Sequence, residues 1–152
     1  MSTTSSNANP NPSAVPRPCP FQIDRVDHIV LQCQDVQATI LWYTKYLGMK
    51  HERFHTAGGE RHALRFGQQK LNLHPSSAPY QPHAALPLPG TQDLCFVLSP
   101  PATADRVLEY WREEGLEILE GGVVGRTGAV GGLRSVYTRD PDGNLIEVSN
   151  YV

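Results

Sequence analysis

An internal duplication constrains the fold of this chain more than any other feature of its sequence. When Gly48 is laid on Gly115, Tyr43 falls on Tyr110, and both stretches follow the order strand, helix and three further strands. A single unit of about 60 residues is marginal at burying a hydrophobic core, so the two units are expected to pack together. We therefore predict an α+β fold of two βαβββ modules, whose mixed sheets curl around a cleft.

The first module is expected to span residues 22–74. Its opening run, Arg25 to Gln32, alternates β-branched and polar residues as a strand does. Asp35 is a suitable cap for a helix in which apolar residues recur at helical spacing until Gly48 ends it. Short strands are predicted to follow at 50–56, 61–66 and 70–74.

The second module, residues 91–152, repeats this order. It begins with a predicted strand at 93–98. Ser99 followed by Pro100 and Pro101 predicts a cap and a first helical turn, and Gly115 ends that helix. Further strands are predicted at 117–124, 133–138 and 144–150, with a hairpin turn at 140–143 between the last two.

Proline-rich segments lie on both sides of the first module. Five of the 13 prolines fall between residues 75 and 90, which we interpret as a linker between the modules. Residues 1–21 are rich in Ser, Asn and Pro, lack an apolar signal segment, and are predicted to be a disordered tail. The three cysteines form no C-x-x-C pair, which favours a reducing compartment, so the cytoplasm is the expected location.

Composition narrows the class of partner. The formal net charge is -2, so no basic surface is expected to hold a nucleic-acid backbone. No stretch of about 18 apolar residues occurs that could cross a membrane. The expected partner is a small molecule.

Four polar residues lie at corresponding places on the first and last strands of the modules: His28 and His74 in the first, Asp93 and Glu147 in the second. If the modules pair about a pseudo-two-fold axis, these side chains converge in the cleft. Two imidazoles and two carboxylates suit one divalent cation such as Zn, Ni, Mn or Fe(II). The sequence therefore predicts a metal-binding cleft.

Four motifs give the chain a resemblance to a known family. They are Val-Asp-His-Ile-Val-Leu at 26–31, Trp-Tyr-x₃-Leu-Gly-Met at 42–49, Leu-Cys-Phe-Val at 94–97 and Asp-Pro-Asp-Gly-Asn-Leu-Ile-Glu-Val at 140–148. With them the chain resembles the vicinal oxygen chelate (VOC) superfamily, which includes glyoxalase I, methylmalonyl-CoA epimerase, extradiol dioxygenases and fosfomycin-resistance enzymes. Its likeness is closest to small glyoxalase-domain proteins, through residues 70–74 and 120–129.

The resemblance implies metal positions residue by residue. The positions on the first and last strands fall on His28 and Glu147, which are the usual residue types. The remaining two fall on His74, where glyoxalase I commonly has an acid and the epimerases a Gln, and on Asp93, where a His is usual. Asp93 is equally well read as a polar residue that starts a strand, so a three-ligand set of His28, His74 and Glu147 stays open.

The leading functional hypothesis is a metal-dependent enzyme that acts on a small oxygenated molecule. The resemblance implies a glyoxalase I-like lyase or isomerase, in which a metal stabilises an enediolate and Glu147 or Asp93 acts as general base. An Fe(II) ring-cleaving dioxygenase-like enzyme is the first alternative. A metal-free protein that binds a drug, as bleomycin-resistance proteins of this fold do, is the second.

Three arginines are candidates for holding an anionic group of the substrate. Arg126 lies in a glycine-rich loop that could close as a lid, while Arg65 and Arg134 lie on predicted strands. The remaining histidines are predicted to be surface residues: His51, His55, His62 and His83. Because members of the superfamily often dimerise, a homodimer is expected, with the modules paired either within one chain or across two.

Overall fold

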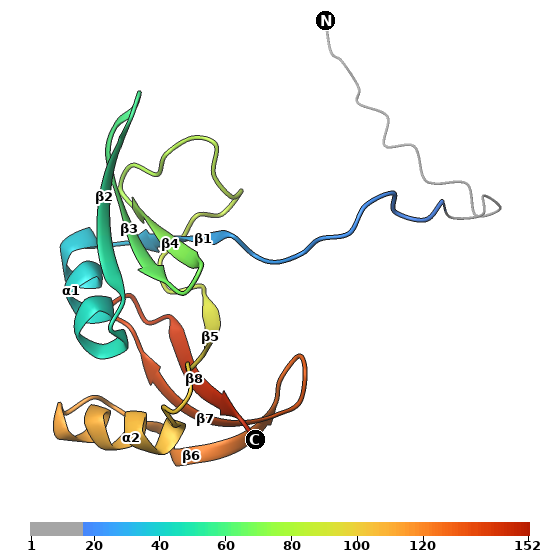
Figure 1. The fold of residues 1–152 in the computed structure, drawn as a ribbon. Helices are drawn as coiled ribbons and strands as arrows, with labels where there is room; N and C mark the ends of the chain where they lie inside the picture. Colours follow the sequence, from blue (N-terminus) through green and yellow to red (C-terminus); the bar gives the residue numbers. More distant parts are fainter. Residues whose placement is uncertain (1–16) are drawn as a thin grey trace, which may run out of the picture.

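The computed structural model describes residues 17–152, so most of the predicted tail, residues 1–16, lies outside the described part of the chain. Residues 17–27 contain no helix or strand and lead into the first sheet. The folded part consists of two four-stranded sheets, each with one helix, which follow one another along the chain (Figure 1).

The first module has the predicted βαβββ order: β1 (His28–Cys33), α1 (Val36–Leu47), β2 (Lys50–Thr56), β3 (Gly59–Phe66) and β4 (Gln69–Pro75). Its strands lie in the order β1-β4-β3-β2, with β1 parallel to β4 and the other pairs antiparallel. The Asp35 carboxylate accepts a hydrogen bond from the Ala38 N–H at 3.0 Å, as a helix cap does. Gly48 ends α1 in the left-handed conformation with φ 64°.

The second module repeats this order: β5 (Asp93–Val97), α2 (Ala104–Glu113), β6 (Leu119–Thr127), β7 (Gly132–Arg139) and β8 (Leu145–Tyr151). Its strands lie in the order β5-β8-β7-β6, again with a parallel first pair. The prediction of an α+β fold with two βαβββ modules and mixed sheets is therefore confirmed.

The start of the second helix differs from the prediction. The cap is Thr103, whose hydroxyl accepts from the Arg106 N–H at 3.3 Å, and not Ser99. The Ser99 carbonyl instead accepts from the Ala102 N–H at 3.1 Å, so the two prolines lie in a turn that precedes the helix. This extra turn connects β5, at the edge of the sheet, to α2, which packs on one face of the sheet.

Buried aromatic side chains join the two modules through their helices. The Tyr43 hydroxyl, on α1, donates to the buried Asp140 carboxylate of the second module at 2.9 Å. Trp111, on α2, is fully buried, and its indole N–H donates to the Tyr46 carbonyl at 3.1 Å. Tyr43 and Trp111 belong to one hydrophobic core that both modules share.

The linker, residues 76–92, contains neither helix nor strand (Figure 1). Its last part is held against the second module at Gly90, where φ is +73° and an added Cβ would lie 2.5 Å from the Asp142 carbonyl oxygen. No helix among residues 17–152 is long and apolar enough to span a bilayer.

Candidate metal and substrate site

One face of each sheet is packed against its helix, and the predicted metal ligands lie on the other face. In the first module, Leu71 and Leu73 of β4 are buried in the core, while the alternate residues Asn72 and His74 are only partly buried. His28, Asn72 and His74 line one pocket of about 510 Å³. We call His28 and His74 the imidazole half-site.

His28 is oriented by its neighbour in sequence. Its Nδ1 lies 2.8 Å from a carboxylate oxygen of Asp27, which accepts the proton of that nitrogen. This contact lowers the pKa of Asp27. The imidazole therefore keeps Nε2 for another partner, which is the arrangement that metal-binding histidines commonly share.

His74 carries a buried nitrogen without a hydrogen bond. No atom of residues 17–152 pairs with its Nδ1. The ring lies edge-on against Tyr80 of the linker, with 4.6 Å between the ring centres. Burial, followed by the positive charge of Arg61 and repulsion from His83, lowers the pKa of His74, which favours the neutral ring.

The second module presents acids at its open face. Glu147 and Asp93 line a pocket of about 360 Å³, which we call the carboxylate half-site. One oxygen of Glu147 accepts hydrogen bonds from the hydroxyls of Ser135 and Ser149, at 2.5 and 3.1 Å. Neither serine donates to its second oxygen. Burial, followed by a hydrogen bond to Glu147, raises the pKa of Tyr137 beside it.

The four predicted side chains are not brought together within one chain. The imidazoles line one pocket and the carboxylates another. Within residues 17–152, no group of three or more His, Cys, Asp or Glu side chains is close enough to hold a metal ion. A single copy of the chain therefore presents two half-sites with different chemistry.

The strand register changes one equivalence between the modules. His28 pairs with Lys70, and Asp93 pairs with Leu145, so a match of His28 with Asp93 places Asn72 opposite Glu147 in the superposition. Overlaying the sequences had matched His74 with Glu147. A shift of two residues keeps side chains on the same face, which is why alternation alone did not reveal Asn72.

The three candidate arginines lie in different environments. Arg126 lines the carboxylate half-site, where its Nε donates to the Tyr137 hydroxyl at 3.0 Å and its guanidinium lies 3.4 Å from Glu120. Arg134 points to the helix side of its sheet and binds Asp105 of α2 through two contacts of 2.8 and 2.9 Å. Arg65 pairs with Glu52 at 3.1 Å and lines neither half-site pocket.

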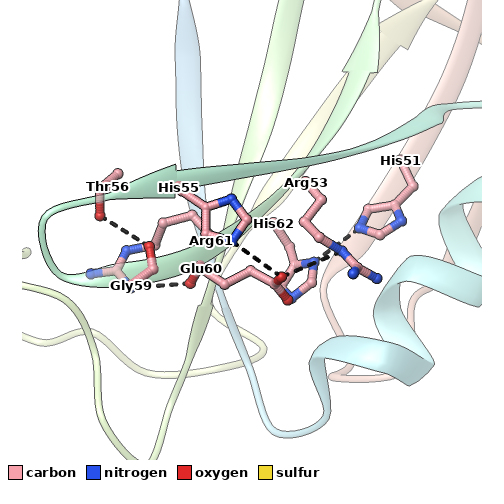
Figure 2. A network of polar contacts seen from close by, with 8 residues as sticks. All are labelled: His51, Arg53, His55, Thr56, Gly59, Glu60, Arg61 and His62. Carbon is pink, nitrogen blue, oxygen red and sulfur yellow. Dashed lines mark hydrogen bonds and ion pairs between the residues drawn. The ribbon is translucent and has the colours of Figure 1, made fainter.

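The histidines predicted to be surface residues include one exception. His62, whose side chain is only 15% exposed, stacks on His51, with 3.0 Å between ring nitrogens (Figure 2). Its second ring nitrogen lies 3.4 Å from Glu60. Figure 2 shows this network along the β2–β3 hairpin; neither His51 nor Glu60 lines the pocket of the imidazole half-site. The prediction of a surface position was wrong for His62, because His62 lies on the same pocket wall as Asn72 and His74, where it is largely covered.

Comparison with known proteins places this geometry in context. The family described as Glyoxalase/Bleomycin resistance protein/Dioxygenase superfamily matches residues 25–148. Virulence protein STM3117 of Salmonella typhimurium is 46% identical over 130 residues, 86% of each chain. Its crystal structure superposes with a TM-score of 0.78, covering 87% of this chain and all of that one. Glyoxalase domain-containing protein RDO1 of Mycosarcoma maydis is 48% identical over 131 residues, 86% of this chain and 70% of the relative.

Two more distant structures share the fold alone. A lactoylglutathione lyase from Agrobacterium tumefaciens is 22% identical with a TM-score of 0.62, and covers 85% of this chain and 95% of its own. TnmS3, an antibiotic binding protein from Streptomyces, is 16% identical with a TM-score of 0.64, and covers 87% of this chain and 99% of its own.

Proposed function

Because this chain belongs to the Glyoxalase/Bleomycin resistance protein/Dioxygenase superfamily, we propose that it is a metal-dependent enzyme of the glyoxalase I type. Its substrate would be a small molecule with two vicinal oxygens, and its reaction an isomerisation or lyase step. The observation that carries the proposal is the division of chemistry between the half-sites: two imidazoles on one sheet and a carboxylate that two serines hold by one oxygen on the other.

The side chains fit a divalent cation such as Zn, Ni, Mn or Fe(II) in kind. His28 offers Nε2, since Asp27 holds Nδ1, and His74 offers a buried nitrogen that has no hydrogen bond to the described residues 17–152. Glu147 offers the oxygen that the serines leave free. Asp93, which is exposed at the start of β5, is the fourth candidate. When bound, the metal would supply Lewis acidity to an oxygen on which negative charge develops.

A homodimer would complete the site. In this arrangement the carboxylate half-site of one subunit faces the imidazole half-site of the other, so each metal takes ligands from both chains. The helix contacts within one chain support this, because Tyr43–Asp140 and Trp111–Tyr46 tie the modules together through their helix-covered sides. The open sheet faces are left for a second copy.

Glu147 is the proposed general base. When it is released from the metal, the oxygen that the serines leave free would take a proton from the carbon beside the substrate carbonyl and return it to the neighbouring carbon. The serine hydroxyls hold the carboxylate in one orientation throughout. Arg126 would bind an anionic group of the substrate through a guanidinium that Tyr137 holds over the same pocket.

Metal content tests the proposal directly. Elemental mass spectrometry of purified protein is expected to find about one divalent metal per chain, and His28→Ala or Glu147→Ala should remove it. His55→Ala, which replaces an exposed histidine outside both half-sites, is the matched control. Stoichiometric metal that survives both site substitutions would contradict the ligand set. Isomerisation of the hemithioacetal of methylglyoxal and glutathione is the activity to assay.

A metal-free binding protein is the second candidate function. It is favoured by the absence, within residues 17–152 of one chain, of any gathered group of three metal donors. The antibiotic binding protein TnmS3 shares the fold. Native protein free of metal, with no hemithioacetal isomerase activity, would replace the enzyme with this candidate. Oxygen uptake with catechols would instead identify a ring-cleaving dioxygenase-like enzyme.

A further inference from the structure

The two rings of the imidazole half-site are held by different means. His28 is oriented by the carboxylate of its neighbour Asp27, which lies 2.8 Å from Nδ1. His74 lacks this support, because no atom of residues 17–152 forms a hydrogen bond with its buried Nδ1. A histidine that binds a metal is usually oriented by a hydrogen bond from its other ring nitrogen. For His74, packing around the ring is the source of orientation that the structure offers instead.

Tyr80, in the linker, packs against the ring of His74. The two rings are tilted by 63° with 4.6 Å between their centres, a favourable geometry for an aromatic pair. Both residues line the pocket of the imidazole half-site. The linker begins with a turn in which the Ala78 N–H donates to the Pro75 carbonyl at 3.1 Å. This ordered turn leads the chain from the end of β4 to the place where Tyr80 meets His74.

Arg61, on β3, holds the ring of Tyr80 in turn. Its guanidinium carbon lies 3.2 Å from the centre of that ring, a cation–π contact. One guanidinium nitrogen also donates to the carbonyls of Gly58 and Glu60, at 3.1 and 3.2 Å. Figure 2 shows Arg61 beside the turn of the β2–β3 hairpin. The cation is therefore anchored on the hairpin, and the ring is anchored on the cation.

Gly58 leaves the space that this guanidinium occupies. A Cβ atom added at Gly58 would lie 2.6 Å from Nη2 of Arg61, closer than side chains tolerate. Gly58 does not have a positive φ, so space and not backbone conformation is what favours glycine here. A series of contacts thus runs from the hairpin turn through Arg61 and Tyr80 to His74.

We propose that Arg61 and Tyr80 are positioning residues that hold the His74 imidazole for the metal, which makes the linker a part of the candidate metal site. This inference rests on the proposed function, because His74 is one of the ligands named there. Tyr80 orients the imidazole, and Arg61 orients Tyr80. A cation close to a divalent metal is unfavourable by itself, so the contact with Tyr80 accounts for the position of Arg61.

Zinc affinity tests the role of Tyr80. Calorimetric titration of Zn²⁺ into the full chain, after treatment with EDTA and dialysis, should show binding about 10-fold weaker in Tyr80→Leu than in wild type, as for other residues that orient a metal ligand. Tyr80→Phe keeps the ring and should bind Zn²⁺ as the wild type does. Equal affinity of wild type and Tyr80→Leu would overturn the inference, and so would an equal loss in Tyr80→Phe.

Gly58→Ala tests the role of Arg61 without changing any charge. The added methyl group displaces the guanidinium and frees the Tyr80 ring, so Zn²⁺ affinity should fall by up to about 10-fold. Gly131→Ala, in the turn of the β6–β7 hairpin, makes only an ordinary contact with Tyr151 and is the matched control. Both glycines lie in exposed turns, so both variants are expected to fold. Wild-type affinity in Gly58→Ala would overturn the role of Arg61.

The orientation of His74 can also be followed without metal. In the EDTA-treated protein, NMR correlation of the ring protons with the ring nitrogens reports the tautomer and the mobility of His74, with His74→Gln for assignment. Wild type and Tyr80→Phe are expected to give the same signal for this ring, while Tyr80→Leu and Gly58→Ala should shift and broaden it. An unchanged His74 signal in both of these variants would overturn the inference.

The outcome is separable from that of the proposed function. Wild-type protein that binds neither Zn²⁺ nor another divalent metal would remove the enzyme proposal, and the His74 signal of the metal-free protein would still decide whether Tyr80 orients the ring. Zinc bound with equal affinity by wild type and Tyr80→Leu would remove this inference alone.

Discussion

The two modules share a backbone plan and differ in the groups that they present on it. Both sheets have a parallel first pair and two antiparallel pairs. The first presents imidazoles and two amides whose oxygens lack a hydrogen bond to residues 17–152, while the second presents a carboxylate held by two serine hydroxyls. Duplication has therefore kept the ladder and changed the chemistry. Each module alone is half of a site, and the proposed enzyme needs one of each kind.

The largest expected effect comes from removing the base of the second module. Glu147→Gln keeps the hydrogen bonds of the serines to one oxygen but takes away the proton acceptor. Under the proposed function, kcat/KM for the hemithioacetal should fall about 10²- to 10⁴-fold. Ser99→Ala, far from both half-sites in its turn before α2, serves as the control in the same steady-state assay. Unchanged kcat/KM in Glu147→Gln would assign the base to another residue.

A mixture of two inactive variants tests how the half-sites combine. His28→Ala and Glu147→Ala are each expected to be inactive. If the site forms across two chains, equal amounts unfolded and refolded together should recover roughly a quarter of wild-type activity, since a statistical mixture contains heterodimers with one intact site. Activity that stays absent in the refolded mixture, although dimers form, would place both half-sites of each centre in one chain.

The hydrogen bond between Tyr43 and Asp140, which joins the two modules, can be removed without changing either half-site. Tyr43→Phe removes the hydroxyl that donates to buried Asp140, while Asn144 still donates to that carboxylate at 2.7 Å. The free energy of unfolding should fall by about 1.5–3 kcal/mol, as for other hydrogen bonds to charged groups. Urea titration measures this value, with Tyr151→Phe, at the exposed end of β8, as the control. A loss no greater than that of Tyr151→Phe would show that the remaining donors, from Asp142 and Asn144, satisfy the carboxylate.

The smallest effect concerns the hairpin of the first module. Burial, and then repulsion from His62 and Arg53, lowers the pKa of His51 below its usual 6.5, with Glu60 acting in the opposite direction. The folded state thus binds this proton less readily than the unfolded state. Stability from the neutral ring is complete above pH 6.5 and is lost as the pH falls through the lowered value.

His51→Gln should therefore reduce the loss of stability between pH 7.5 and pH 5.5 in urea titrations, by an amount limited by the exposure of the ring. His55→Gln removes a histidine from the same strand, where the side chain is 73% exposed, and is the matched control. An equal pH dependence in wild type and His51→Gln would contradict this account.

Sequence patterns predicted the helices and strands better than they predicted which residues of the two modules correspond. The cap at Asp35, the glycine that ends α1 and the alternation of β4 were sufficient for the βαβββ order. Which residue lies opposite a given strand residue depends on tertiary packing. Sequence alternation fixes only the face of the sheet, so registers that differ by two residues fit it equally well. This is why Asn72 was missed.

The sequence also did not predict which face of its sheet each strand residue points to. Arg134 was a candidate for substrate binding, yet its strand turns it to Asp105, while the adjacent Ser135 contacts Glu147. Knowing how β7 pairs with β8 would have distinguished the direction of Arg134 from that of Ser135. Tyr137 lies opposite Glu147 in this pair, and Ser135 lies on the same face as Tyr137. The prediction that Arg126 lies in a loop that could close as a lid was wrong, because Arg126 belongs to β6 and lies opposite Leu133 of β7.

Because the two ends of the linker are fixed, the residues between them are free to vary in length during evolution. Pro75 completes β4 opposite Cys33, and Gly90 lies against the Asp142 carbonyl, so both ends are anchored whatever lies between them. Insertions or deletions at 83–89 would reshape the wall that faces Gln32 and leave the strands that carry His28 and Glu147 in place. Relatives that differ here in length are expected to retain the same reaction and to accept substrates of different size, so that substrate range can drift while the catalytic chemistry stays constant.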